Sequence, residues 1–320
     1  MAGAGAEFGK VVVVTRKTTL EELVERHGTL GQARFLAASR GGSLDDVEAA
    51  HDAYRAAAAT LAGAIPPGTR SQWIDRGFLP NFLFGARDLV ITLGQDGLVV
   101  NTAKYLDGQP VLAFNPDPAR IDGVLLPFGM EAADETVHAA LAGRLERRGV
   151  TMARATLDDG QSIEAVNDIF IGTRSHASAR YRIEHGGRGE DQSSSGVIVS
   201  TGAGSTGWYR SVLAGAAGVA AALGAPAATV VRDRYRFEMS ARELRFSVRE
   251  PFASRTSSAD IVCGHVTDDV GLSIVSRMPR GGTIFSDGME EDFLSFEAGV
   301  RATIGISGRT LELCWTSPGQ

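Results

Sequence analysis

The chain has 320 residues, of which 43% are hydrophobic, and a formal net charge of −6. This length exceeds what most single hydrophobic cores occupy, so we expect two domains, and the acidic balance without a dominant basic patch argues against nucleic acid as a partner. The first residues are typical neither of a signal peptide nor of a membrane span, so we expect a cytoplasmic protein that does not bind membranes.

The first part of the chain predicts alternating strands and helices. Continuous runs of β-branched residues are typical of buried strands, and Thr or Ser before an amphipathic stretch, with Gly or Pro after it, indicates a helix. The elements expected here are, in chain order, a strand at 10–15, a helix ending at Gly28, a helix from Ser43 to just before Pro66, a strand at 87–94, a helix at 98–106 and a strand at 109–115. Strand, helix and strand in close succession form a βαβ unit, which predicts a parallel sheet with helices on its faces.

The pattern changes after residue 128. A helix is predicted at 133–149, and short strands separated by Gly, Ser, Asp and Pro dominate after it. These strands are expected at 151–157, 162–172, 179–185, 195–201, 243–250, 259–266, 272–276, 300–306 and 310–315, with one apolar helix at 208–223 and an exposed low-complexity loop at 184–196. We therefore expect an α/β + β protein, with an α/β domain at 1–128 and a β-rich domain at 129–320.

The stretch "GQDGL", residues 94–98, follows a predicted strand and precedes a predicted helix. In an open α/β sheet, ligands bind at the carboxyl ends of strands, and Gly94 and Gly97 would let backbone N–H groups approach a phosphate. Asp96 could accept a proton from a hydroxyl or help to hold Mg²⁺. The alternative is that Asp96 only caps the helix. A hairpin fits less well, because the following segment is long and helix-like.

The tract "TGAGSTG", residues 201–207, carries the G-x-G-x-x-G pattern between a predicted strand and a predicted helix. With a further strand at 227–233 that ends in an aspartate, it imitates the dinucleotide-binding fingerprint of nicotinamide-dependent oxidoreductases. The strand-rich chain that follows argues against that interpretation, since a fingerprint domain needs more βα units. The hydroxyls of the tract suit direct hydrogen bonds to ribose or phosphate. The alternative is a helix N-terminus that merely packs closely on a sheet.

Asn167 and Asp168 lie within an otherwise apolar strand segment. Polar side chains in such a place need partners. The pair therefore either forms a local turn or bulge, or faces a ligand. An amide beside a carboxylate suits the edge of a base and the diol of a ribose.

No metal site is predicted from the cysteines and histidines. Cys263 and Cys314 are far apart in the sequence, so we expect both to be small buried residues. The six histidines show no metal-ligand spacing. There is also no G-x-x-x-x-G-K-[ST] motif, so a kinase built on this chain would not be a P-loop enzyme.

In this order, the three tracts resemble the NAD kinase family, which belongs to a superfamily shared with diacylglycerol kinases. The family carries a Gly-Gly-Asp-Gly-Thr turn, an Asn-Glu pair, and a Thr- and Gly-rich tract that ends in an aromatic residue. These motifs stand here as "GQDGL", "ND" and "TGAGSTGW". The mitochondrial-type branch is the most similar, because further segments match it in collinear order. These segments are "KVVVVTRKT", "FNPDPARIDG", "SSG", "LRFSVREPFASR" and "GGTIFSDG".

The resemblance implies a Rossmann-like α/β domain followed by a β-sandwich domain. It implies phosphoryl transfer from ATP, with Mg²⁺, to the 2′-hydroxyl of the adenosine ribose of NAD, with Asp96 as the base. The nucleotide-binding residues that it implies are Gly94, Gln95, Gly97, Leu98, Asn115, Gly123, Asn167, Asp168, Thr201, Gly204, Ser205, Thr206 and Trp208. No metal would be held by the protein alone, since Mg²⁺ would be bound through the phosphates. The implied assembly is a homodimer with small-molecule nucleotides as partners.

Three residues depart from the family pattern: Gln95 replaces the second glycine of the turn, Leu98 its threonine, and Asp168 the glutamate of the pair. If that glycine position needed a positive φ, Gln95 would cost roughly 1 kcal/mol or more. The changes leave open a same-superfamily kinase with another hydroxyl acceptor (a sugar, nucleoside or lipid) and a non-catalytic NAD-binding homologue. Polyphosphate stays an alternative donor. Because Asp96 is retained, an active phosphotransferase with an alcohol acceptor is favoured, and the oxidoreductase interpretation is the weakest.

Overall fold

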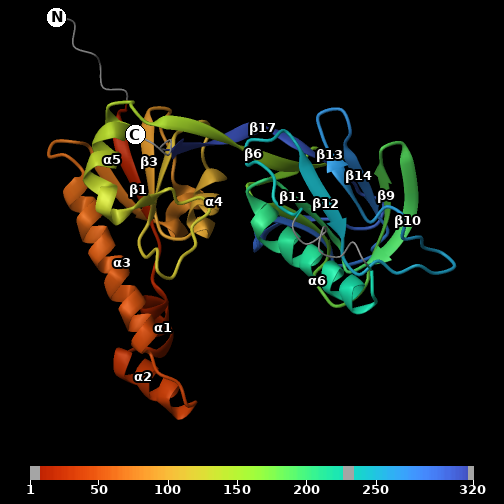
Figure 1. Cartoon of the computed structure of the whole chain (residues 1–320), viewed down its shortest axis with the longest axis horizontal. Helices are drawn as coiled ribbons and strands as arrows, with labels where there is room; N and C mark the ends of the chain where they lie inside the picture. The colour runs from red at the N-terminus through yellow and green to blue at the C-terminus, as the bar shows by residue number, and fades with distance from the viewer. Residues whose placement is uncertain (1–7, 226–233, 316–320) are drawn as a thin grey trace, which may run out of the picture. The chain divides into compact units, whose positions relative to one another are not determined.

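The computed structural model describes residues 8–225 and 234–315, which divide into two compact units (Figure 1). The first unit runs to Arg148 and also takes in residues 312–315; the second unit is Gly149–Leu311. The division follows Arg148 rather than residue 128, because the helix after residue 132 packs in the hydrophobic core of the first unit. The chain passes between the units twice, within β6 (Glu146–Leu157) and within β17 (Arg301–Trp315).

A parallel sheet forms the centre of the first unit, as the βαβ pattern predicts. Its strands are β1 (Lys10–Thr15), β2 (Ser71–Asp75), β3 (Asp88–Leu93), β4 (Val111–Asn115) and β5 (Phe128–Gly129), with the end of β17. The order is β2-β1-β3-β4, and β4 also pairs in parallel with β5 and with the end of β17. Every residue of β3 and β4 is buried, which explains why both strands appear as continuous apolar runs.

The first unit also contains helices. They are α1 (Thr19–His27), α2 (Leu30–Ser39), α3 (Asp45–Ala64), α4 (Asp96–Ala103) and α5 (Ala133–Leu141), with 3₁₀ turns η1 (Arg76–Asn81) and η2 (Met130–Ala132). The prediction of α1 is confirmed in detail: Thr18 and Glu21 form a reciprocal capping box, and the helix ends at Gly28 with φ +84°. The predicted helix at 133–149 is too long. It ends at Leu141, since Gly143 adopts φ +66° and β6 follows at once.

The second unit consists of two antiparallel sheets around one hydrophobic core. One sheet has the order β13-β12-β11-β8-β15-β16, and the other follows the path β10-β9-β14-β17-β6-β7. Their strands are β7 (Ser162–Ala165), β8 (Asp168–Thr173), β9 (Ala179–His185), β10 (Arg188–Ser194), β11 (Val197–Ser200), β12 (Leu244–Val248), β13 (Cys263–Val266), β14 (Leu272–Ser276), β15 (Gly282–Ser286) and β16 (Met289–Ser295), with parts of β6 and β17. Helix α6 (Trp208–Ala222) packs on β11 and β12 (Figure 1).

Several expectations for the second unit are wrong. The stretch at 184–196 is not a loop but the turn and second strand of the β9–β10 hairpin, closed by Gly186 and Gly187 at φ +57° and +75°. Its polar composition misled the prediction, because β10 lies at a sheet edge. The single strand expected at 162–172 is two strands with a turn between them, and the two strands expected at 300–306 and 310–315 are one.

The cysteines differ in environment. Cys314 is buried, as predicted, but Cys263 is exposed because it lies on β13, an edge strand with one face toward solvent. The strand expected at 227–233 lies outside the described residues. No helix in the described ranges combines the length and apolarity needed to cross a bilayer.

Candidate functional site

The turn after β3 places Asp96 at the first position of α4, so a helix and not a hairpin follows it. Asp96 does not cap this helix. The N-cap residue is Gln95, which makes no side-chain capping bond. Both oxygens of the Asp96 carboxylate instead accept backbone hydrogen bonds from the loop after β4: Leu125 N–H at 2.8 Å and Val124 N–H at 3.1 Å. The amides fix the direction of the carboxylate.

Asp96 is therefore equipped for proton transfer. Its side chain is only partly buried, and a carboxylate oxygen that accepts one amide bond still has a lone pair for a second donor. An oriented and accessible carboxylate at the carboxyl end of a parallel strand can accept a proton from a substrate hydroxyl.

Asn115 and Gly123 shape the loop that brings these amides to Asp96. The buried Asn115 side chain donates to Ile121 O at 2.9 Å and accepts from Asp117 N–H at 3.0 Å. Gly123 has φ +67°, and a Cβ there would lie 2.8 Å from Asn115 Nδ2. Both residues therefore fold the loop onto itself. The resemblance implied only that they line a nucleotide pocket.

The two unusual residues of the turn fit it without strain. Gln95 has φ −91° and ψ 167°, an extended conformation, so it does not incur the conformational cost of a positive φ. Leu98 is 3% exposed and packs on Gly94, where an added Cβ would lie 2.9 Å from Leu98 Cδ2. Gln95 and Gly97 are exposed, with open space around Gly97. Leu98 thus belongs to the core beneath the turn.

Replacing Leu98 with the family's threonine should lower the free energy of unfolding by about 1–3 kcal/mol, because it removes buried apolar surface and buries a hydroxyl. Urea unfolding measures this change. The matched control is Gln95→Gly, which restores the other family residue at an exposed, unstrained position and should change stability by about 1 kcal/mol or less. Equal stabilities of wild type and Leu98→Thr would show that Leu98 contributes no packing.

In the second unit, Asn167 lies in the turn between β7 and β8, and Asp168 is the first residue of β8. The carboxylate of Asp287 holds this turn: one oxygen accepts from the N–H groups of Asn167 at 2.7 Å and Asp168 at 3.2 Å, and the other from Val166 N–H at 3.1 Å. Asp287 has φ +56° at an Asp-Gly pair between β15 and β16. Sequence reasoning missed this role, and the Asp-Gly hairpin signal was the available pointer.

Asp168 is a buried carboxyl group with 8% of its surface exposed. Burial, and secondarily the charge of Asp287, raises its pKa to about 7. A carboxyl in this state can either donate a hydrogen bond or accept two near neutral pH. It is the kind of group that recognises a diol, and perturbed groups of this kind gather at functional sites.

The Asp168 carboxyl should make stability depend on pH. Its pKa is near 3.8 when unfolded and about 7 when folded, so the folded chain holds the extra proton between these values. The free energy of unfolding should therefore fall as pH rises from about 4 to 7, by at most about 4 kcal/mol for about three units. Urea unfolding between pH 4.5 and 8 measures this. Asp168→Asn should make the free energy of unfolding less dependent on pH and should be more stable than wild type at pH 8. The same pH dependence in both proteins would contradict the raised pKa of Asp168.

The tract 201–207 packs directly against the Asn167 turn. Thr201 N–H donates to Asn167 O at 2.9 Å, the Thr201 hydroxyl donates to Val166 O, and Gly204 N–H donates to the same hydroxyl at 3.2 Å. The fully buried Ser205 hydroxyl donates to Gly202 O at 2.7 Å. Thr201 and Ser205 thus build the turn, whereas Thr206 is only partly buried.

Trp208 begins α6 and carries an aromatic surface beside this turn. Its ring stacks on Phe170 with centroids 5.5 Å apart and planes 13° apart, and the Arg249 guanidinium lies 5.3 Å from its centroid. Although a strand and a helix flank the glycines, β11 pairs antiparallel with both β8 and β12. The dinucleotide fingerprint requires a parallel βαβ unit, so the topology argues against the oxidoreductase interpretation.

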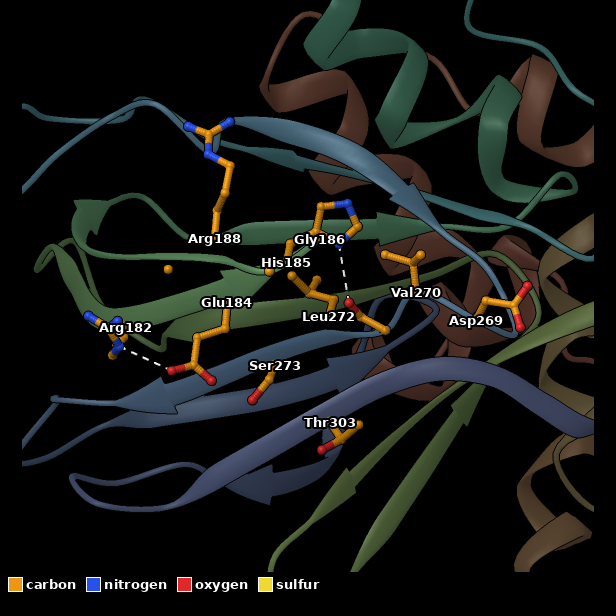
Figure 2. A pocket seen from close by; sticks show the side chains of 13 residues that line it. Arg182, Glu184, His185, Gly186, Arg188, Asp269, Val270, Leu272, Ser273 and Thr303 are labelled. Carbon is orange, nitrogen blue, oxygen red and sulfur yellow. Dashed lines mark hydrogen bonds and ion pairs between the residues drawn. The ribbon is translucent and has the colours of Figure 1, made fainter.

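A separate cavity of about 660 Å³ lies on the second unit, over β9 and β14 (Figure 2). None of the predicted site residues lines it. Two of its charged side chains pair with each other, since Arg182 Nε donates to Glu184 at 3.1 Å, and Arg301 Nη1, from outside the lining, donates to the other Glu184 oxygen at 2.9 Å. His185 is bonded to Gly271 O. This cavity is separate from the candidate site.

A parallel α/β unit and an antiparallel β-rich unit, each carrying an oriented carboxyl group on a turn, define the α/β + β class of the chain. No protein-family model and no curated protein matches it. Solved structures do. Yeast NADH kinase complexed with NADH is similar over 100% of this chain and 89% of that chain, with a TM-score of 0.59 and 14% identity. An NAD kinase from Archaeoglobus fulgidus in complex with ATP is similar over 95% of this chain and 92% of that chain, with a TM-score of 0.54 and 16% identity. The chain has the fold of the NAD kinases.

Proposed function

We propose that the chain is a member of the NAD kinase family that phosphorylates the 2′-hydroxyl of the adenosine ribose of NAD to give NADP, with ATP as donor. The observation that carries this proposal is Asp96, an accessible carboxylate oriented by two backbone amides at the carboxyl end of β3. The fold shared with two kinases supports it, and so do the collinear motifs.

In the proposed reaction, the Asp96 carboxylate accepts the proton of the 2′-hydroxyl. The hydroxyl oxygen forms a bond to the terminal phosphorus of ATP as the bond to the bridging oxygen breaks, and ADP leaves. Gly97, exposed and with open space around it, lets the backbone approach phosphate. Positioning and charge stabilisation supply most of the rate in phosphoryl transfer, so the fixed direction of Asp96 matters as much as its basicity.

We assign recognition of the acceptor to the second unit. The side chains of Asn167 and Asp168, whose backbone N–H groups are held by Asp287, are proposed to bind the ribose and base of NAD, with Thr206 and Trp208 beside them. Thr201, Gly204 and Ser205 would act by holding this turn in place, since their polar groups are bonded within the protein.

The described residues contain no group of three or more His, Cys, Asp or Glu that could hold a metal ion. Magnesium, which neutralises phosphate charge in such reactions, is proposed to be held largely by phosphate oxygens. This agrees with the general preference of Mg²⁺ for one or two carboxylates together with substrate phosphates.

The test is an assay of purified protein with ATP, Mg²⁺ and either NAD or NADH, in which NADP or NADPH is measured. Formation of the phosphorylated dinucleotide is the expected result. Release of ADP only with a sugar, nucleoside or lipid would reassign the acceptor. Tight NAD binding without turnover would indicate a non-catalytic homologue, and hydride exchange with a substrate would indicate an oxidoreductase.

A further inference from the structure

In the sheet of the first unit, the chain adds β2 on one side of β1 and then β3 and β4 on the other side. The direction in which strands are added therefore reverses between β1 and β3. In open α/β sheets, ligands bind at the carboxyl ends of the strands at such a reversal. Arg16 follows the last residue of β1, and Gln95 lies two residues beyond β3. Both line one cavity of about 240 Å³ that lies wholly within the first unit.

Arg16 is a fixed cation without an anion. Its Nε is buried and has no hydrogen-bond partner, and no ion pair of Arg16 occurs among the described residues. Its backbone N–H donates to the Tyr54 hydroxyl at 3.2 Å, which in turn donates to Leu93 O at 3.1 Å. The side chain lies against Gly94, where an added Cβ would be 3.7 Å from Arg16 Cδ. Arg16 is thus held beside the turn that carries Asp96.

The other charged groups of the cavity are compensated or lie at its rim. Arg120 donates to Asp117 at 2.7 Å, and His51 Nδ1 lies 2.8 Å from the Thr18 hydroxyl. Asp46 lines the cavity as an exposed carboxylate. Such a carboxylate suits a magnesium-complexed phosphate better than a bare one. Arg16 is therefore the cation of this cavity that is left for an external anion.

We propose that Arg16 binds the phosphate chain of the phosphoryl donor in this cavity. That the bound phosphate chain serves as phosphoryl donor rests on the proposed function. That Arg16 binds a phosphate chain does not. A guanidinium with an unused N–H suits this anion, because planar forked donors match phosphate oxygens. A terminal phosphate held there would be adjacent to the Asp96 turn.

The donor chemistry could come from a nucleoside triphosphate or from inorganic polyphosphate. A neighbouring cavity of about 640 Å³ shares Arg16, His51 and Tyr54 with the first. It adds an apolar part that includes Trp73, which is 39% exposed. The rest of its added lining is Thr15 and the charged side chains Lys17, Glu21, Glu25, Arg55 and Asp75. The apolar part can accept a nucleobase by stacking and apolar contact. A nucleoside triphosphate would use both cavities, whereas inorganic polyphosphate would use only the first.

The experiment measures binding of Mg-ATP and of inorganic triphosphate by calorimetry, in wild type, Arg16→Gln and a matched control. The control is Arg40→Gln, which removes the same charge at the exposed C-cap of α2. Arg16→Gln should weaken both ligands by about 10- to 100-fold, the range for a charge-assisted hydrogen bond, and leave NAD binding within about twofold. Arg40→Gln should leave all three unchanged. Arg16→Lys should recover part of the loss, which separates charge from folding defects.

Trp73→Leu distinguishes the two sources, since it should weaken ATP alone if the donor is a nucleoside triphosphate and neither ligand if it is inorganic polyphosphate. Wild-type affinity of Arg16→Gln for both ligands, at an unchanged melting temperature, would overturn the proposal. Binding is measured without turnover. A failure to form NADP would therefore refute the proposed function without affecting the conclusion that Arg16 binds the phosphate chain.

Discussion

Replacing Asp96 with asparagine is expected to lower the turnover of NAD to NADP by about 10²- to 10⁴-fold, the usual contribution of a general base. Asparagine has nearly the same shape, but its amide cannot accept the proton of the 2′-hydroxyl. Binding of NAD should change little, since the residues proposed to recognise the acceptor lie in the second unit. The measurement is kcat from an NADP-specific coupled assay, together with NAD affinity from calorimetry.

The control for this variant is Asp107→Asn, which removes a carboxylate from the exposed turn before β4, at the amino-terminal end of the strands. It should retain full turnover. Asp96→Asn also loses one of two acceptors for Val124 and Leu125 N–H, so we expect a stability loss of about 1 kcal/mol. Undiminished kcat in Asp96→Asn would remove this residue from the mechanism, whatever its effect on stability.

Local patterns predicted the first unit well. The apolar runs of β1, β3 and β4 are buried on both faces, and the Thr18–Glu21 capping box marks the start of α1 without help from the rest of the chain. Helix α2 escaped prediction because it buries only Ala33, so it has hardly any apolar face to recognise. The β9–β10 hairpin escaped because its edge strand is rich in Ser, Gly and charged residues.

The candidate site was predicted where its residues are neighbours in sequence and missed where its contacts are long-range. The position of Asp96 where a turn passes into a helix follows from Gly94 to Leu98 alone. Its amide partners lie 28 and 29 residues away, and those of Asp287 lie 119 to 121 residues away. No local pattern encodes such pairs. The same holds for Leu98, whose role is visible only from its packing on Gly94.

Gly204→Ala is expected to have the second large effect, because it tests the packing on which the acceptor turn depends. A Cβ at Gly204 would lie 2.1 Å from the carbonyl oxygen of Asn167 and 2.5 Å from its carbon. These are backbone atoms held by Thr201 and Asp287, so they cannot move aside cheaply. We expect the free energy of unfolding to fall by about 3 kcal/mol, with NAD affinity reduced by about tenfold or more because Asn167 is displaced.

Two further glycines of the same segment separate stability from recognition. Gly215 lies within α6 with open space around it, so Gly215→Ala should stabilise the chain by about 0.5–1 kcal/mol through helix propensity. At Gly202 a Cβ would lie 2.1 Å from Glu238 O, on different backbone from Asn167. Gly202→Ala should therefore lose similar stability but less NAD affinity than Gly204→Ala. If urea unfolding and calorimetry gave both variants the same loss of NAD affinity, general destabilisation would explain it, and the specific link between Gly204 and the acceptor turn would fail.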